Sequence, residues 1–169
     1  MDGPAVQAAK DLGLRVAAST SDFSDSEIIY RLKQSPREPV KYQYLLVSEN
    51  ADDAPRVDVL SLASFARAKE RLKKKAKGGA GIEITVAQAR KMDATGVAKW
   101  VADASDLYRF CQSAGFQFIL SSGADSPQGT VSGQSLDALL KMIGIDPQRH
   151  WKETGEWLES WLERRVHRR

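Results

Sequence analysis

Apolar residues along this chain follow two patterns. Short, nearly continuous apolar runs are typical of buried strands, and they predict strands at 14–18, 42–47, 57–62, 81–86 and 116–120. Longer segments with apolar residues three and four apart are typical of helices packed on one face, and they predict helices at about 5–12, 26–34, 63–77, 97–113, 135–143 and 148–165. Strands and helices therefore alternate along most of the chain.

Glycine and proline mark the ends of these segments. Gly13, Gly78 with Gly79, and Gly115 follow predicted helices, where glycine commonly ends a helix. Pro36 and Pro39 interrupt the chain before the strand at 42–47. A polar turn is predicted at 50–55, and a loop rich in Ser, Gly and Pro at 121–133.

Alternating strands and helices favour a parallel sheet built from βα units. A complete eight-stranded barrel typically needs about 250 residues, whereas this chain has 169. We therefore predict an α/β fold that is (β/α) barrel-like with parallel strands, and short or incomplete relative to a full barrel. We expect one domain over residues 1–169, with a basic C-terminal tail from about residue 163.

Composition excludes several classes of protein. Hydrophobic residues make up 42% and charged residues 28%, which is ordinary for a globular protein and argues against a disordered or fibrous chain. No apolar run approaches the roughly 20 residues that cross a bilayer, and the start, Met1–Pro4, lacks the pattern of a secretory signal. We expect an intracellular protein with no membrane partner.

Residues able to support catalysis are sparse. Both histidines, His150 and His167, lie outside the strand-rich region, so the usual ligands of a barrel zinc hydrolase are lacking. Carboxylates alone can hold magnesium, and Asp58, Glu83 and Asp125 lie on or just after predicted strands. A metal-dependent phosphoesterase of the related barrel class is therefore the alternative function. The other interpretation of each carboxylate is a local hydrogen bond or salt bridge at the barrel rim.

Nucleophile and nucleotide motifs give no better support for an enzyme. Cys111 is the single cysteine and lies in a helical stretch, where we expect a buried structural thiol. The Ser121–Gly123 segment lacks the G-x-S-x-G elbow. The glycines at 78–81 precede a strand, whereas phosphate cradles lead from a strand into a helix. We predict no catalytic residue, no resident metal and no cofactor.

Positive charge is concentrated in two places, although the formal net charge is only +3. Such clusters are typical of phosphate binding, and the alternative interpretation is a solvated helix face and a frayed terminus. No aromatic residue interleaves either cluster, so base-specific recognition is not indicated there. The candidate RNA-binding residues are Arg71, Lys73, Lys74, Lys75 and Lys77 in the first cluster and Arg164, Arg165, Arg168 and Arg169 in the second.

Trp157 and Trp161 lie four residues apart in the last predicted helix and should share one face. Packing against the barrel is one interpretation of this pair. An exposed pair would instead be a protein–protein contact, because tryptophan is enriched at interfaces. That second interpretation also leaves open a binding module that assembles through this face and contacts no RNA.

Three stretches together resemble the component 3 family of ribonuclease P. They are Val-Asp-Val-Leu-Ser-Leu at 57–62, Gly-Ile-Glu-Ile-Thr-Val-Ala at 81–87, and Phe-Ile-Leu-Ser-Ser-Gly-Ala-Asp-Ser at 118–126. They are similar to the family's "VD-hydrophobic-LS" strand, its "EI" strand and its strand ending in "SSGA-x-S". The helix at 136–140 and the pair Ile143–Gly144 also match, and the resemblance spans about residues 40–145.

The resemblance implies a barrel related to a phosphoesterase family but without its metal-binding histidines. It implies a non-catalytic subunit of ribonuclease P, in which the RNA subunit removes 5′ leaders from precursor tRNA. Expected partners are ribonuclease P RNA, precursor tRNA and other protein subunits, especially the small α/β component 2. The expected location is the cytoplasm, or the nucleus in a eukaryote.

This chain departs from the family pattern in two places. Family members usually begin with an extra strand and helix, often with an early aspartate, and this chain starts near a helix. The segment Pro127–Ser132 replaces an expected Leu-Arg-x-Pro pattern. Any contact that depends on that arginine is therefore not predicted here.

Overall fold

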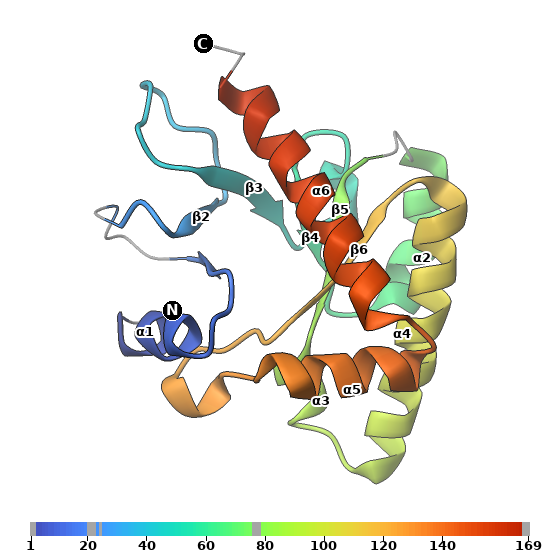
Figure 1. Cartoon of the computed structure of the whole chain (residues 1–169). Coiled ribbons are helices and arrows are strands. Elements are labelled where there is room, and N and C mark those ends of the chain that lie inside the picture. The colour runs from blue at the N-terminus through green and yellow to red at the C-terminus, as the bar shows by residue number, and fades with distance from the viewer. Residues whose placement is uncertain (1–2, 20–22, 24, 76–78, 167–169) are drawn as a thin grey trace.

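A computed structural model describes residues 3–19, 23, 25–75 and 79–166. Its centre is a six-stranded sheet in which every neighbouring pair is parallel and the strands follow one another in chain order (Figure 1). The strands are β1 (Ala17–Ala18), β2 (Ile29–Leu32), β3 (Tyr44–Ser48), β4 (Val59–Ser61), β5 (Gly81–Thr85) and β6 (Gln117–Ser121). The sheet curls into a half-barrel, which confirms the prediction of an incomplete (β/α) barrel.

Helices connect and flank these strands. They are α1 (Gly3–Asp11), α2 (Phe65–Lys75), α3 (Val86–Ala89), α4 (Ala94–Ala114), α5 (Gly133–Ile143) and α6 (Pro147–Val166), with short 3₁₀ turns η1 (Ala51–Asp53) and η2 (Pro127–Gly129). Within the described residues, no helix is both long and apolar enough to cross a membrane.

The helix predicted at 26–34 is wrong, because the structure places strand β2 there. Ile28, Ile29 and Leu32 have helical spacing, but Tyr30 between them is also fully buried. In β2, alternate side chains enter two different apolar clusters on opposite faces of the sheet, with Ile29 in one and Tyr30 in the other. A strand buried on both faces has no period-two pattern, so it cannot be distinguished from a short helix by periodicity.

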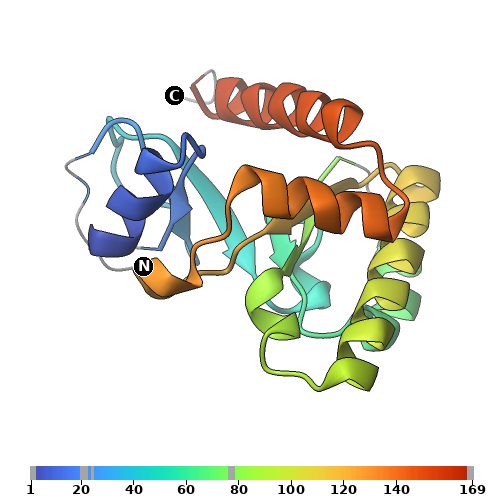
Figure 2. The same ribbon diagram turned by 60° about the horizontal axis from the view of Figure 1, so that its bottom comes forward.

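The two faces of the sheet pack against different sets of helices, and α6 contributes to both, since Trp151 near its start packs against the cluster on the outer face. On the outer face, Leu60, Ile82 and Phe118 pack with residues of α2, α4 and α5. On the inner face, Ile29 and Val59 pack with α6, which crosses β5 and β6 in Figure 1 and lies apart from α2 and α4 in Figure 2. Helix α6 therefore packs on the concave side of the sheet. In a complete barrel, two further strands would enclose that side.

The closest approach of α6 to the sheet is at Gly81, the first residue of β5. A methyl group there would lie 3.0 Å from ring carbons of Trp157 and closer still to the side chain of Ile119. The absence of a side chain at Gly81 therefore allows the Trp157 ring to lie directly on β5.

We predict that Gly81→Ala lowers the free energy of unfolding by about 1–3 kcal/mol, because the added methyl group overpacks this contact. Gly155→Ala is the matched control on α6, since a methyl group there meets no atom within 4 Å. It should be neutral or stabilising by up to about 1 kcal/mol. Urea unfolding of both variants measures the difference, and equal stabilities would contradict this packing.

His150, near the start of α6, is a buried polar residue in this packing. It is 2% exposed, its ring lies 5.8 Å from that of Phe118, and its Nε2 has no hydrogen-bond partner within the described residues. Burial lowers the pKa of His150 to about 4, because the charged imidazolium would lose its hydration. The imidazole is therefore neutral in the folded protein at neutral pH.

This lowered pKa predicts a specific loss of stability in mild acid. Between the ordinary histidine pKa of 6.5 and the folded value of about 4, protons bind the unfolded chain and not the folded one, so stability falls as the pH falls. The loss between pH 7.5 and pH 5 is about 2 kcal/mol. His150→Phe should remove this part of the pH dependence in urea unfolding, and an unchanged profile would contradict the assignment.

Candidate functional site

A polar network lies on the inner face of the sheet, toward the carboxyl ends of the strands. At its centre Glu83 of β5 is 2% exposed and receives two hydrogen bonds from Arg31 of β2, each 2.6 Å long. The hydroxyl of Ser121 on β6 donates to Glu83 Oε1 at 2.7 Å, and Ser61 on β4 lies opposite Glu83 in the strand register, where its hydroxyl helps to lower the pKa of this carboxylate. Four strands therefore contribute one side chain each to a single buried cluster.

The ion pair requires the curvature of the sheet. β2 and β5 are separated by β3 and β4, and three strand spacings in a flat sheet amount to about 14 Å. The guanidinium of Arg31 nevertheless makes two hydrogen bonds to the carboxylate of Glu83. The Arg31 side chain is 20% exposed. The pair therefore joins the two sides of the half-barrel across its inner curve.

Electrostatics keep both members charged. Burial alone would raise the pKa of Glu83, but the hydrogen bonds and charge of Arg31, with the hydroxyls of Ser121 and Ser61, outweigh it and hold that pKa below its usual value. Burial likewise opposes the charge on Arg31, whereas Glu83 raises the pKa of Arg31. The carboxylate of Glu83 accepts three hydrogen bonds, two from Arg31 and one from Ser121, so both of its oxygens are engaged.

The three stretches that carry the family resemblance meet in this network. Ser61 lies in the first stretch, Glu83 in the second and Ser121 in the third. In a barrel, the carboxyl ends of the strands are where functional groups usually gather. Here these ends are joined by an internal network of hydrogen bonds.

The remaining residues of the third stretch shape the turn after β6. Gly123 adopts a positive φ of 61°, and a side chain there would approach Cβ of Thr85 to 2.6 Å. The carbonyl of Ser122 accepts a hydrogen bond from the amide of Ala87 at 3.0 Å. The Ser-Ser-Gly motif thus brings the loop after β6 into contact with the end of β5.

The carboxylates considered for a metal site do not come together. Ser61 lies opposite Glu83 in the strand register. Asp58 directly precedes β4 and is three residues before Ser61, which places it about 10 Å from the level of Glu83 along the strand. The buried Asp58 accepts a hydrogen bond from the amide of Leu46 at 2.7 Å. Asp125 is exposed in the loop after β6. In the part of the chain that the structure describes, no three His, Cys, Asp or Glu residues form a group able to hold a metal.

The first basic cluster lies on the exposed side of α2. Arg71 is 3.6 Å from Asp52, Lys73 is 2.9 Å from Glu70, and Lys74 has no ion-pair partner among the described residues. Lys75 is the last residue of α2, and Lys77 lies outside the described residues. In the second cluster Arg164 is exposed and Arg165 is in the last turn of α6, while Arg168 and Arg169 lie outside the described residues.

Trp157 and Trp161 connect these two clusters. Both indole N–H groups donate to the carbonyl of Gly79, at 2.6 and 2.8 Å, and Gly79 immediately precedes the strand that follows α2. The guanidinium of Arg164 lies over the Trp161 ring, 4.9 Å from its centre. The ends of α2 and α6 consequently lie on the same side of the molecule, at the top of Figure 1. The tryptophan pair, half-buried against the sheet, has an internal packing role, and its binding of a partner stays a prediction.

Sequence reasoning missed Arg31, because its strand was interpreted as a helix. It identified Cys111 correctly as a buried thiol, 1% exposed, and burial raises the pKa of that thiol to about 12. No protein-family model matches the chain, and a comparison with curated proteins also finds no match. The fold and this network therefore define the class, an incomplete parallel (β/α) barrel with a buried ion pair toward the carboxyl ends of its strands.

We predict that Glu83→Gln destabilises the protein by about 3–5 kcal/mol, because it leaves the Arg31 guanidinium buried without its counter-charge. The double variant Arg31→Met with Glu83→Gln should be less destabilised than the sum of the two single variants. Urea unfolding of all four proteins gives the coupling free energy. Strict additivity would contradict the ion pair's role in joining β2 to β5.

Proposed function

We propose that this protein is a non-catalytic subunit of ribonuclease P that supports RNA-catalysed removal of 5′ leaders from precursor tRNA. The observation that carries the proposal is the meeting of the three family-like stretches around Glu83. Ser61, Glu83 and Ser121 are separated in the chain, but Ser61 lies opposite Glu83 on the neighbouring strand and Ser121 is hydrogen-bonded to it. The resemblance therefore rests on residues that act together structurally.

The chemistry of the site supports a structural role for this network. Among the candidate metal ligands, Glu83 lies in β5 toward its carboxyl end, where Arg31 neutralises its charge and the hydroxyl of Ser121 also donates to it. A carboxylate in that state has little capacity left to bind magnesium or to accept a proton. This favours a subunit over the alternative metal-dependent phosphoesterase.

The basic ends of α2 and α6 are the proposed RNA contact. They lie on one side of the molecule and are held there by the hydrogen bonds from Trp157 and Trp161 to Gly79. Exposed Lys and Arg side chains bind the RNA backbone by neutralising phosphates and releasing counterions. The proposed surface fits a phosphate backbone and carries no sequence preference of its own.

The first experiment is recovery of the tagged protein from its native cells at mild salt, followed by sequencing of the bound RNA and identification of the bound proteins. The proposal expects ribonuclease P RNA together with a component 2 protein. Recovery of neither would overturn the proposal. Hydrolysis of simple phosphoesters with added Mg²⁺ would then test the alternative.

We predict that replacing Lys73, Lys74 and Lys75 with alanine weakens binding to the recovered RNA and flattens its salt dependence. Each lost phosphate contact reduces the slope of log K against log salt by about 0.7–0.9, so the triple variant should lose about 2–3. Alanine at the exposed residues Lys91, Lys99 and Lys141 changes the net charge equally and is the control. Equal slopes for the two triple variants would remove α2 from the RNA contact.

A further inference from the structure

An aromatic cluster lies around the starts of β2 and β3, outside both basic clusters and largely outside the region of family resemblance. Phe23 and Tyr42 stack with ring centres 4.6 Å apart and planes 9° apart. The edge of Tyr30 supports both rings, at 5.0 Å from Phe23 and 4.9 Å from Tyr42. Phe23 is nevertheless 43% exposed, one of the few large apolar side chains so exposed in the described part of the chain.

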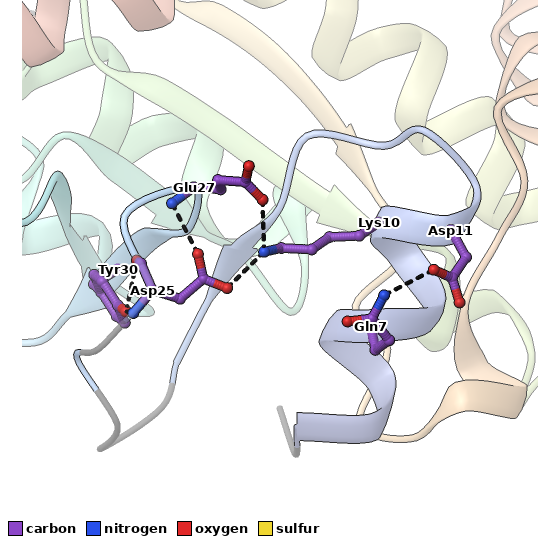
Figure 3. Close-up of polar contacts among 6 residues, drawn as sticks. All are labelled: Gln7, Lys10, Asp11, Asp25, Glu27 and Tyr30. Atoms are coloured by element: carbon purple, nitrogen blue, oxygen red, sulfur yellow. Dashed lines mark hydrogen bonds and ion pairs between the residues drawn. The ribbon is translucent and has the colours of Figure 1, made fainter.

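The supporting ring and the neighbouring chain are held in place by polar contacts, which Figure 3 shows. The hydroxyl of Tyr30 donates to the carbonyl of Asp25 at 2.9 Å and accepts from its amide at 3.0 Å. Lys10 of α1 reaches the carboxylates of Asp25 and Glu27, at 2.5 and 2.9 Å. The Tyr30 ring, which packs against Phe23, is therefore fixed in position by these hydrogen bonds. A fixed supporting ring reduces the entropy cost of binding a flat ligand.

The connection from β2 to β3 carries exposed positive charge, and its last cation, Lys41, directly precedes Tyr42 of this cluster. It begins with Lys33 directly after β2, contains Arg37, and ends with Lys41 beside Tyr42. All three side chains are exposed, and among the described residues none of them is in an ion pair. Glu38 is the one acid in this connection. A flat aromatic surface beside an exposed cation such as Lys41 matches a base joined to its phosphate.

We propose that Phe23 and Tyr42 form a stacking platform for an unpaired base of single-stranded RNA, with Lys41 contacting the adjoining phosphate. Every base has a π-face, so aromatic stacking of this kind tolerates any sequence. The inference rests on the proposed function for its choice of RNA as the ligand. It adds a second contact that binds bases, whereas the ends of α2 and α6 bind the phosphate backbone.

The test measures binding of the full chain to a fluorescently labelled five-nucleotide oligoadenylate, with an oligonucleotide of equal length and charge that lacks bases as the comparison. Wild-type protein should bind the oligoadenylate more tightly than the abasic form. Phe23→Leu keeps an apolar side chain but removes the π-face, and should weaken binding by about 5- to 150-fold. Tyr42→Phe should bind as wild type does, and Met142→Ala, which alters another exposed apolar residue, should have no effect.

A second measurement uses the wild-type protein alone and does not depend on the folding of any variant. An oligonucleotide with 2-aminopurine in place of adenine should lose fluorescence when its base stacks on an aromatic ring. Bound oligonucleotide with unquenched 2-aminopurine would overturn the proposal, as would equal affinity for the abasic form. Loss of a copurifying protein in Phe23→Leu with unchanged oligoadenylate binding would also overturn it, and would make the cluster a protein interface.

The two proposals fail in different ways. The platform is tested on a short oligonucleotide without ribonuclease P RNA, so recovery of no such RNA from cells leaves its result unaffected. Conversely, the alanine variant of Lys73, Lys74 and Lys75 should keep its affinity for the oligoadenylate. Loss of that affinity in this variant would place oligonucleotide binding on α2 and overturn the platform.

Discussion

The buried contact between Arg31 and Glu83 is the interaction on which the curled sheet depends. It connects β2 to β5 across the inner curve, a separation that a flat sheet would not allow these side chains to bridge. Desolvating two charges is costly, and the cost is recovered only where the geometry is good and the remaining lone pairs are satisfied. Two parallel hydrogen bonds from Arg31 and a third from the hydroxyl of Ser121 meet that condition. An apolar pair would fill the space without specifying which strands must approach.

Helix α6 complements this ion pair at the other end of the inner face. A complete barrel encloses its interior with strands, whereas this half-barrel has six. Trp157, Leu158, Trp161 and Leu162 of α6 cover the apolar residues of the open face. The inner face is thus divided along the strands, with an apolar part under α6 and a polar part around Glu83. Gly81 makes the division possible, because the Trp157 ring occupies the space that a side chain would need.

Local patterns predicted the elements of this fold better than its contacts. The strands at β3, β4, β5 and β6 are apolar runs bounded by glycine or polar turns, and the sequence identified all four within a few residues. The sequence predicted a helix in place of β2, because both faces of this strand are buried. Arg31, which lies in β2, was therefore not identified as a site residue. Glu83 was noticed as a carboxylate on a strand, but its partner lies 52 residues away. No local pattern indicates which distant charge will neutralise a buried one.

The same reasoning explains why the basic clusters were predictable and their proximity was not. Exposed Lys and Arg residues on α2 and α6 are evident from charge alone, whereas the contact that relates them joins Trp161 to Gly79, 82 residues apart. In the proposed function, that contact sets the spacing of the phosphate-binding side chains. The sheet, held in its curve by Arg31 and Glu83, in turn sets the position of the aromatic platform relative to them. The ion pair and the tryptophan contacts thus fix the interior of the half-barrel, and the outer helices and edge strands take their positions from that interior.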